Sequence, residues 1–310
     1  MKTVYDMAVI GGGPAGYTAA LYAARAGMRV CVLEMALAGG QMTTTDTIDN
    51  YPGFDGGIEG WELGDKMKRN AERFGAVTVQ TAVSACRLDG DVKQLETDIG
   101  TVLARTVVLA TGASPKLLGI DDETRLWGRG VHTCAHCDGR FYRGKTVAVI
   151  GGGNSAAADA LYLARFAKQV YLVHRRDTLR AEQYYKNALA DTSVEFLWNK
   201  NAVRFLGEDR VEGVILRDTA DGTEMTLACD GVFVSIGRQP QTALVEGQLS
   251  LDRNGYIIAD ESTETALPGV FAAGDVRTKA LRQVVTAASD GACAAHAAEL
   301  YLAAHPEKSH

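Results

Sequence analysis

The chain has 310 residues, of which 46% are hydrophobic and 23% are charged, and its formal net charge is −6. This length is enough for two domains with substantial cores. The acidic balance argues against the broad basic field of a protein that binds nucleic acid or an anionic membrane. The sequence contains no signal-peptide pattern and no apolar run of about 18 residues, so we expect a cytoplasmic protein that does not enter a membrane.

The first predicted unit opens with an apolar run from Val4 to Ile10, typical of a buried strand. The turn GGGPAG follows, then an alanine-rich helical stretch from Pro14 to Ala26 and a second strand from Met28 to Leu33. The next stretch is rich in Gly, Thr, Asp and Pro, and its length indicates a functional loop. A further buried strand is predicted from Thr106 to Ala110.

A second unit repeats the first. The segment GGGNSAAADALYLARFAKQVYLVH, which starts at Gly151, aligns without a gap to GGGPAGYTAALYAARAGMRVCVLE, which starts at Gly11, with nine identities in 24 positions. The repeat follows a predicted strand from Thr146 to Ile150, and another strand is expected from Gly231 to Ile236. The C-terminal part contains the strand-like segment PGVFAAGD and an alanine-rich helix.

This order of elements predicts parallel, doubly wound sheets. The fold class is therefore α/β, with two Rossmann-like dinucleotide-binding domains, the second inserted in the first. The first unit must complete its sheet with PGVFAAGD, because the middle of the chain builds its own sheet. We expect an outer domain from residues 1–112 and 244–310, and an inserted domain at 113–243. Both crossing segments contain Gly and Pro and form a plausible hinge.

Each glycine turn predicts a nucleotide site. Glycine lets the backbone approach a pyrophosphate, which then lies against the N-terminus of the following helix. In the first unit the second strand ends at Glu34, whose carboxylate can accept hydrogen bonds from ribose hydroxyls. The residues of the first turn are Gly11, Gly13, Pro14, Ala15 and Gly16.

The second site has the opposite charge at the corresponding position. His174 stands where the first unit has Glu34, and Arg175, Arg176 and Arg180 follow it. A carboxylate would repel a ribose 2′-phosphate, whereas guanidinium groups bind phosphate in a bidentate manner. A solvated charge run is the alternative interpretation, but its place after a strand of a dinucleotide unit favours NADPH over NADH.

Between the two repeats, Cys134 and Cys137 form a C-x-x-C motif, and Asp138 follows at once. In a reducing compartment such a pair indicates redox chemistry or a metal site. No metal is expected, since four ligands within six residues, His132 and His136 included, do not readily surround one tetrahedral zinc ion. We expect His136 and a possible helix start to favour a thiolate, and Asp138 to act as an acid or base.

Two nucleotide sites and a vicinal thiol pair in one chain indicate a two-electron relay from one nucleotide, through another, to a disulfide. Thiols do not accept a hydride directly, and a flavin bridges nicotinamide and thiol chemistry. By elimination, the first site therefore favours FAD.

Together these segments resemble the low-molecular-weight thioredoxin reductases, flavoproteins of the pyridine nucleotide–disulfide oxidoreductase class, along essentially the whole chain. The resemblance implies an NADPH-dependent thioredoxin-disulfide reductase that acts as a homodimer on thioredoxin or a thioredoxin-like protein. For FAD it implies, besides the first turn and Glu34, the residues Gly40, Gln41, Asn50, Gly274, Asp275, Arg282 and Gln283. For NADPH it implies Gly153, Asn154, Ser155, Arg175, Arg176 and Arg180.

Two other interpretations remain at this point. A flavoprotein reductase of the same fold would serve a different disulfide acceptor, such as a glutaredoxin- or peroxiredoxin-type partner. A flavin-binding sensor would not turn over at all, although the intact Cys134, Cys137 and Asp138 argue against it.

Overall fold

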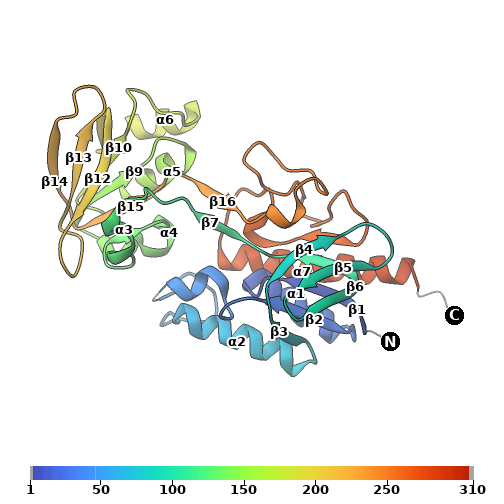
Figure 1. The fold of residues 1–310 in the computed structure, drawn as a ribbon. Helices are drawn as coiled ribbons and strands as arrows, with labels where there is room; N and C mark the ends of the chain where they lie inside the picture. The colour runs from blue at the N-terminus through green and yellow to red at the C-terminus, as the bar shows by residue number, and fades with distance from the viewer. Residues whose placement is uncertain (1–2, 46, 307–310) are drawn as a thin grey trace. The chain divides into compact units, whose positions relative to one another are not determined.

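The computed structural model describes residues 3–45 and 47–306 and divides the chain into two compact units. Unit 1 comprises residues 1–114 and 239–310, and unit 2 comprises residues 115–238. Figure 1 shows their helices and strands, coloured along the chain. The expected α/β fold, with one Rossmann-like unit inserted in another, is confirmed.

The sheet of unit 1 runs in the order β3-β2-β1-β6-β5-β4, and β17 also pairs with β6. In the middle of this sheet, β1 pairs with β6 in parallel. β5 pairs with the first half of β6 in an antiparallel manner, and β17 pairs with the second half in parallel. The predicted completion of this sheet by PGVFAAGD is therefore confirmed. The strands are β1 (Val4–Ile10), β2 (Val30–Glu34), β3 (Val77–Gln80), β4 (Val83–Arg87), β5 (Lys93–Thr97), β6 (Gly100–Leu109) and β17 (Val270–Ala272).

Small residues bring two helices of unit 1 close together. α1 (Pro14–Arg25) and α7 (Val284–Ala304) contribute buried alanines to one apolar core with α2 (Gly60–Arg73) beside it. A Cβ atom on Gly291 of α7 would lie 2.2 Å from the carbonyl oxygen of Ala15, so a larger residue has no room. This close contact fixes the start of α1, where the first glycine turn ends.

The stretch predicted as a loop after β2 is partly ordered by its own apolar cluster. It contains the 3-10 helix η1 (Gly40–Thr44) and an isolated bridge between Ile48 and Ile58, while residue 46 lies outside the described residues. Met42, Ile48 and Ile58 pack with Leu63 of α2. The segment is therefore held against the helix that follows it.

Unit 2 has a parallel sheet in the order β11-β10-β9-β15-β8 and a separate antiparallel sheet, β12-β13-β14. The expected parallel sheet is therefore present in each unit, and antiparallel strands that the sequence did not predict extend it in unit 1 and form a second sheet in unit 2. A short connection that contains Asp221 and Gly222 (φ 75°) joins β13 to β14, and such turns favour hairpins. The strands are β8 (Val131–His132), β9 (Thr146–Ile150), β10 (Gln169–His174), β11 (Glu195–Trp198), β12 (Lys200–Leu206), β13 (Gly213–Asp218), β14 (Glu224–Ala228) and β15 (Gly231–Val234).

Where the chain crosses from one unit to the other, β7 (Ala113–Pro115) pairs with β16 (Arg238–Pro240).

Unit 2 also has four α-helices within its described residues. Each helix in the described part of the chain is too short or too polar to cross a bilayer. These helices are α3 (Asp121–Arg125), α4 (Ala135–Asp138), α5 (Asn154–Leu163) and α6 (Gln183–Ala190); the other 3-10 helices are η2 (Gly139–Tyr142), η3 (Ala243–Val245) and η4 (Gly274–Val276).

Candidate active site

The first glycine turn is closed on its inner side and open at its centre. A Cβ atom on Gly11 would lie 2.5 Å from the carbonyl oxygen of Ala110, and one on Gly16 would lie 1.9 Å from that of Gly11. A Cβ atom on Gly13 would meet no atom within 4 Å. The turn therefore leaves the N-terminus of α1 open to a group such as a pyrophosphate.

Two oxygen-bearing side chains converge on Gly12 at the end of β2. Glu34 accepts hydrogen bonds from the amide of Gly12 at 2.5 Å and from that of Ala36 at 2.8 Å. The Tyr17 hydroxyl is buried, and a Cβ atom on Gly12 would lie 3.0 Å from it. Burial, with a smaller effect of the Glu34 charge, raises the pKa of Tyr17 to about 12, so the hydroxyl keeps its proton.

Two further residues expected at the FAD site come from η1. Gly40 faces the glycine turn, since a Cβ atom on it would lie 3.5 Å from the Cα atom of Gly13. Gln41 donates a hydrogen bond from Nε2 to the carbonyl oxygen of Ala113. The structure thus brings this loop to the open side of the first turn.

Four more residues expected at the FAD site form two pairs of contacts near the start of α7. The Nδ2 atom of Asn50 donates to Oε1 of Gln283 at 2.9 Å, and Gln283 caps α7. The Arg282 guanidinium lies 4.0 Å from the ring centroid of Tyr256 and donates to the carbonyl oxygen of Asp275 at 3.4 Å. Asn50 and Gln283 are therefore in contact, as are Asp275 and Arg282.

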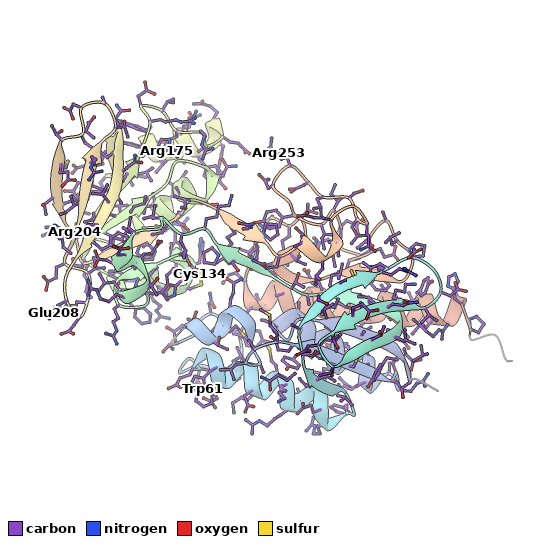
Figure 2. All side chains as sticks on the ribbon, in the orientation of Figure 1. Trp61, Cys134, Arg175, Arg204, Glu208 and Arg253 are labelled. Carbon is purple, nitrogen blue, oxygen red and sulfur yellow. A yellow bond between two sulfur atoms is a disulfide. The ribbon has the colours of Figure 1, made fainter. Side chains whose placement is uncertain are left out.

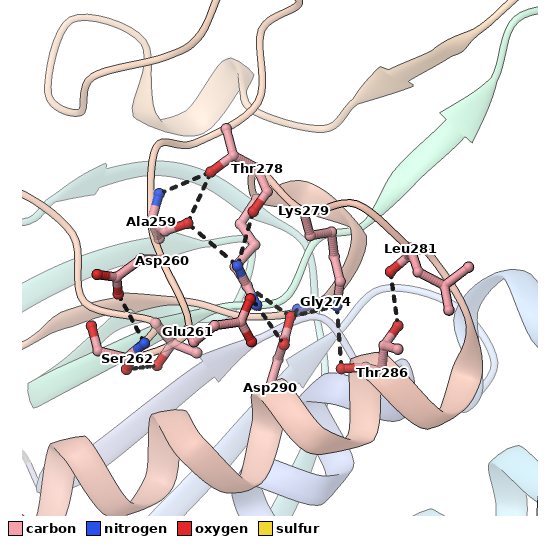
Figure 3. A network of polar contacts seen from close by, with 12 residues as sticks. Ala259, Asp260, Glu261, Ser262, Gly274, Thr278, Lys279, Leu281, Thr286 and Asp290 are labelled. Carbon is pink, nitrogen blue, oxygen red and sulfur yellow. Dashed lines mark hydrogen bonds and ion pairs between the residues drawn. The ribbon is translucent and has the colours of Figure 1, made fainter. Parts of the chain in front are cut away.

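A buried ion network supports this region, and the sequence analysis did not identify it. Asp290 accepts hydrogen bonds from the amide of Gly274, from two nitrogens of Arg277 and from Lys279, all at 2.8–2.9 Å. Figure 3 shows Asp290 on α7 reaching toward Gly274 and Lys279. Burial alone would raise the pKa of Asp290, but the hydrogen bonds from Arg277 and Lys279 outweigh it and lower the pKa. An aspartate among the alanines in the first half of this helix was the available signal.

The second glycine turn repeats the pattern of the first. A Cβ atom on Gly151 would lie 2.3 Å from the carbonyl oxygen of Ser235, whereas one on Gly153 would meet no atom within 4 Å. Ala156 takes the place of the third glycine and is fully buried. The N-terminus of α5 is therefore open in the same way as that of α1.

His174 is buried directly beneath this turn. A Cβ atom on Gly152 would lie 2.2 Å from the imidazole ring, and His174 itself is 4% exposed. Burial lowers the pKa of His174, and the charges of Arg180, Arg176 and Arg175 lower it further. The ring is therefore neutral near pH 7, and within this group the positive charge is carried by the arginines.

The segment after β10 folds back on the glycine turn. The amide of Arg180 donates to the carbonyl oxygen of Gly152 at 2.7 Å, and Asn154 forms two hydrogen bonds with Glu182 at 2.8 and 2.9 Å. Ser155 and all three arginines are exposed; Figure 2 labels Arg175. The guanidinium groups are thus attached to a segment fixed beside the open turn.

The cysteine pair forms a disulfide at the start of α4. Cys134 and Cys137 are joined, with their Cα atoms 5.3 Å apart, and Cys134 is labelled in Figure 2. The Cys137 amide points at Cys134 Sγ at a distance of 3.2 Å, so Cys134 also caps this short helix. The expected helix start at the C-x-x-C is confirmed.

Asp138 is paired with a histidine that the sequence analysis considered only as a metal ligand. Oδ2 of Asp138 lies 3.2 Å from Nδ1 of His132, and Nε2 of His132 lies 2.7 Å from the hydroxyl of Tyr142. The short spacing of these three residues was a signal, but their convergence depends on the bend from α4 into η2.

His136 does not have the expected electrostatic role. Its ring stacks on Tyr162 with the centroids 4.3 Å apart. Loss of solvent contact, with a smaller effect of the Arg165 charge, lowers the pKa of His136. The imidazole is therefore mainly neutral at pH 7, so the expectation that His136 favours a thiolate gains no support from a charge on this ring and stays a prediction. No group of three or more His, Cys, Asp or Glu suited to a metal occurs in residues 3–45 and 47–306.

Two glycine turns suited to dinucleotides and a C-x-x-C disulfide in one chain are typical of the pyridine nucleotide-disulphide oxidoreductases. The model of that family matches residues 5–291. The chain is 46% identical over 308 residues to the thioredoxin reductase of Streptomyces clavuligerus, covering 98% of this chain and 96% of the relative. It belongs to the thioredoxin reductases within this family, as the resemblance implied.

Two other relatives agree with this assignment. The bifunctional thioredoxin reductase/thioredoxin of Mycobacterium leprae (strain TN) is 46% identical over 307 residues, which cover 98% of this chain and 67% of the relative. The crystal structure of thioredoxin reductase from Streptococcus pyogenes MGAS5005 superimposes on this chain with a TM-score of 0.91 and has 42% sequence identity to it. The match covers 98% of this chain and 100% of that chain.

Proposed function

We propose that the chain is an NADPH-dependent flavoprotein that reduces the disulfide of a thioredoxin, with FAD bound to the outer domain and NADPH to the inserted domain. The observation that carries the proposal is the Cys134–Cys137 disulfide, with Asp138 beside it, in a chain that also has two open glycine turns. The proposed relay runs from NADPH through FAD to this disulfide and then to the partner.

The residues of unit 1 fit a flavin dinucleotide. The open backbone at Gly13 suits a pyrophosphate, and the Glu34 carboxylate at the end of β2 suits the ribose hydroxyls of the adenosine. Gly40, Gln41, Asn50, Gly274, Asp275, Arg282 and Gln283 would complete the site. Bound FAD would supply the step between two-electron nicotinamide chemistry and thiol chemistry.

The residues of unit 2 fit NADPH. Gly153, Asn154 and Ser155 would bind the pyrophosphate at the N-terminus of α5. Arg175, Arg176 and Arg180 are exposed beside that turn and would bind the 2′-phosphate. His174 would support the turn from beneath, because it is buried and neutral.

The chemistry of the cysteine pair fits a protein disulfide as the acceptor. One reduced cysteine attacks the partner's disulfide and releases one partner thiol, and the second cysteine then breaks the mixed disulfide and releases the other. The Cys134–Cys137 disulfide forms again. A relative named bifunctional thioredoxin reductase/thioredoxin supports thioredoxin as this partner.

An apolar surface on unit 1 supports a homodimer. Tyr22 of α1 is 48% exposed and Val285 of α7 is 42% exposed, and both line a groove of about 390 Å³ with residues of α2. Exposed tyrosine and aliphatic side chains of this kind suit the core of a protein interface. A cytoplasmic location, which the sequence predicts, would fit an enzyme that draws electrons from NADPH.

A coupled assay tests the proposal. NADPH oxidation is measured with oxidised thioredoxin and insulin for the wild type and for Cys137→Ser, with Cys293→Ser as a control because Cys293 is an exposed single thiol on α7. We expect activity in the wild type and the control, and none in Cys137→Ser, which should still be reduced by NADPH and lose its flavin absorbance. Normal thioredoxin reduction by Cys137→Ser would disprove the relay.

A further inference from the structure

We propose that His132 is a positioning residue that orients the Asp138 carboxylate through Nδ1 and is itself held by Tyr142. This inference rests on the proposed function, because it assigns Asp138 a proton-transfer role in thiol–disulfide exchange. The chain of contacts from Asp138 to His132 to Tyr142, at 3.2 and 2.7 Å, carries it.

The histidine is fixed by a packed aromatic cluster. His132 is 8% exposed and stacks on Phe233 of the neighbouring strand, with the ring centroids 5.3 Å apart. The Tyr142 ring meets both rings edge-on, each at 5.4 Å. A Cβ atom on Gly231 would lie 2.3 Å from the Tyr142 ring, so this glycine leaves the space that the tyrosine fills. The imidazole therefore has one orientation available.

The hydrogen-bond partners assign the proton positions on this ring. Nδ1 lies 3.2 Å from an Asp138 oxygen, and an ionised carboxylate can only accept, so the proposal places the ring proton on Nδ1, facing Asp138. Nε2 then accepts from the Tyr142 hydroxyl. Burial, with smaller effects of Asp138, Asp230 and Cys229, raises the pKa of Tyr142, so the hydroxyl remains a donor. Each group in the relay has the partner that it needs.

The contacts from Asp138 to His132 and Tyr142 define how Asp138 takes part in thiol–disulfide exchange with the partner. Asp138 accepts the proton of the attacking cysteine thiol, and the thiolate sulfur forms a bond to one partner sulfur while the partner's disulfide bond breaks. Asp138 then returns the proton to the released partner sulfur, so protons and electrons balance. The contact with Nδ1 of His132 keeps one oxygen of Asp138 fixed for this exchange.

Other charged groups face this relay from the packed elements. Lys145 lies over the Tyr142 ring at 5.4 Å, and the Asp230 carboxylate accepts a hydrogen bond from the amide of Thr146 at 2.9 Å. Cys229 is buried, and burial raises the pKa of its thiol to about 12, so it stays neutral. Both variants below leave these groups in place, so they contribute equally to each pH profile.

Two variants separate hydrogen bonding from packing. His132→Phe keeps an aromatic ring against Phe233 but removes both polar contacts, the one with Asp138 and the one with Tyr142. His132→Asn loses the ring but keeps an amide donor at the position of Nδ1. The first measurement is the rate at which iodoacetamide alkylates the dithiothreitol-reduced dithiol, as a function of pH and without NADPH or thioredoxin. The second is kcat and KM with thioredoxin.

We expect His132→Phe to lower kcat by roughly 10-fold to 100-fold, the range that one hydrogen bond to a charged group can supply. The acid side of its alkylation profile should move to higher pH, while KM for thioredoxin stays unchanged. His132→Asn should keep the wild-type profile and most of kcat. If His132→Phe behaves like the wild type and His132→Asn is impaired, the residue serves packing alone and the inference is overturned.

The alkylation profile also separates this inference from the proposed function. If the wild type fails to reduce any thioredoxin, the proposed function fails, while a shift confined to His132→Phe still supports the relay. If thioredoxin is reduced normally and the three alkylation profiles coincide, the positioning role is wrong although the function stands.

Discussion

The two glycine turns have nearly the same backbone, but the side chains after the second strand of each unit have opposite charge. Gly13 and Gly153 both face open space at the start of a helix. Glu34 accepts a hydrogen bond from the first turn, whereas the buried His174 is followed by exposed arginines in the second. The shared backbone suits a pyrophosphate, and the charge at the strand end distinguishes one nucleotide from the other.

Each unit also holds a carboxylate close to its turn, buried in unit 1 and half-buried in unit 2, with different partners. Asp290 in unit 1 accepts hydrogen bonds from Arg277 and Lys279. Asp159 in unit 2 accepts one from the Ser235 hydroxyl at 2.5 Å, and burial raises its pKa to about 6 despite this bond and the Arg238 charge. The charge of Asp290 is therefore compensated by two cations. At Asp159 burial outweighs such compensation, so the free energy of keeping it ionised in the folded protein depends on pH.

Replacing the two carboxylates should have unequal effects on the free energy of unfolding. Asp290→Asn leaves Arg277 and Lys279 buried without their anion and should destabilise unit 1 by about 3–5 kcal/mol. Asp159→Asn keeps a hydrogen-bonding side chain beside Ser235 and should cause no loss at pH 8. Urea denaturation of the FAD-loaded protein, followed by tryptophan fluorescence and by release of flavin, measures both. Equal destabilisation by the two variants would remove the distinction.

The third glycine position of each turn offers a second comparison. In Gly16→Ala the new Cβ atom would lie 1.9 Å from the carbonyl oxygen of Gly11, and such overpacking should cost about 2–3 kcal/mol and release FAD. Ala156→Gly should cost only about 1 kcal/mol, from helix propensity, with NADPH binding kept. The measurements are the flavin content after gel filtration and the KM for NADPH. Retention of full flavin by Gly16→Ala would contradict the assignment of the first turn.

The Asp159 carboxyl predicts a pH dependence of stability. Its folded pKa of about 6 lies above the ordinary value of 3.8 that it has in the unfolded chain, so its contribution to stability is fully present below about pH 3.8 and is lost as the pH rises through about 6. The stability of Asp159→Asn relative to the wild type should therefore rise by about 1–3 kcal/mol between pH 5 and pH 8. Melting curves at the two pH values measure this difference, and a constant difference would show that Asp159 is not buried as described.

Local patterns predicted the repeated turns, the C-x-x-C and the β17 strand, because each depends on a short run of residues with a distinct spacing. Contacts that depend on tertiary packing were missed. The His132–Asp138–Tyr142 relay requires the chain to bend after α4, and the neutral state of His136 depends on Tyr162, which is on α5. Neither bend nor stacking partner is encoded in residue spacing.

Other features had signals that the sequence analysis did not use. α2 places Leu63, Met67 and Ala71 on one face at four-residue intervals, with i,i+4 ion pairs on its surface, a pattern that indicates a helix. The Asp221-Gly222 pair indicated the hairpin of β13 and β14. By contrast, the partners of Asp290 become evident only when η4 and α7 are placed together.

The choice of nucleotide tests the central comparison most directly. Steady-state kcat/KM is measured with NADPH and with NADH for the wild type and for Arg175→Ala/Arg176→Ala. Each charge-assisted hydrogen bond to the 2′-phosphate contributes about 1.5–3 kcal/mol, so the double variant should lose about 100-fold or more in kcat/KM for NADPH, mostly through KM. Activity with NADH, which lacks that phosphate, should change little. A wild type that prefers NADH, or a double variant that keeps its preference for NADPH, would contradict the assignment of the arginines to the second site.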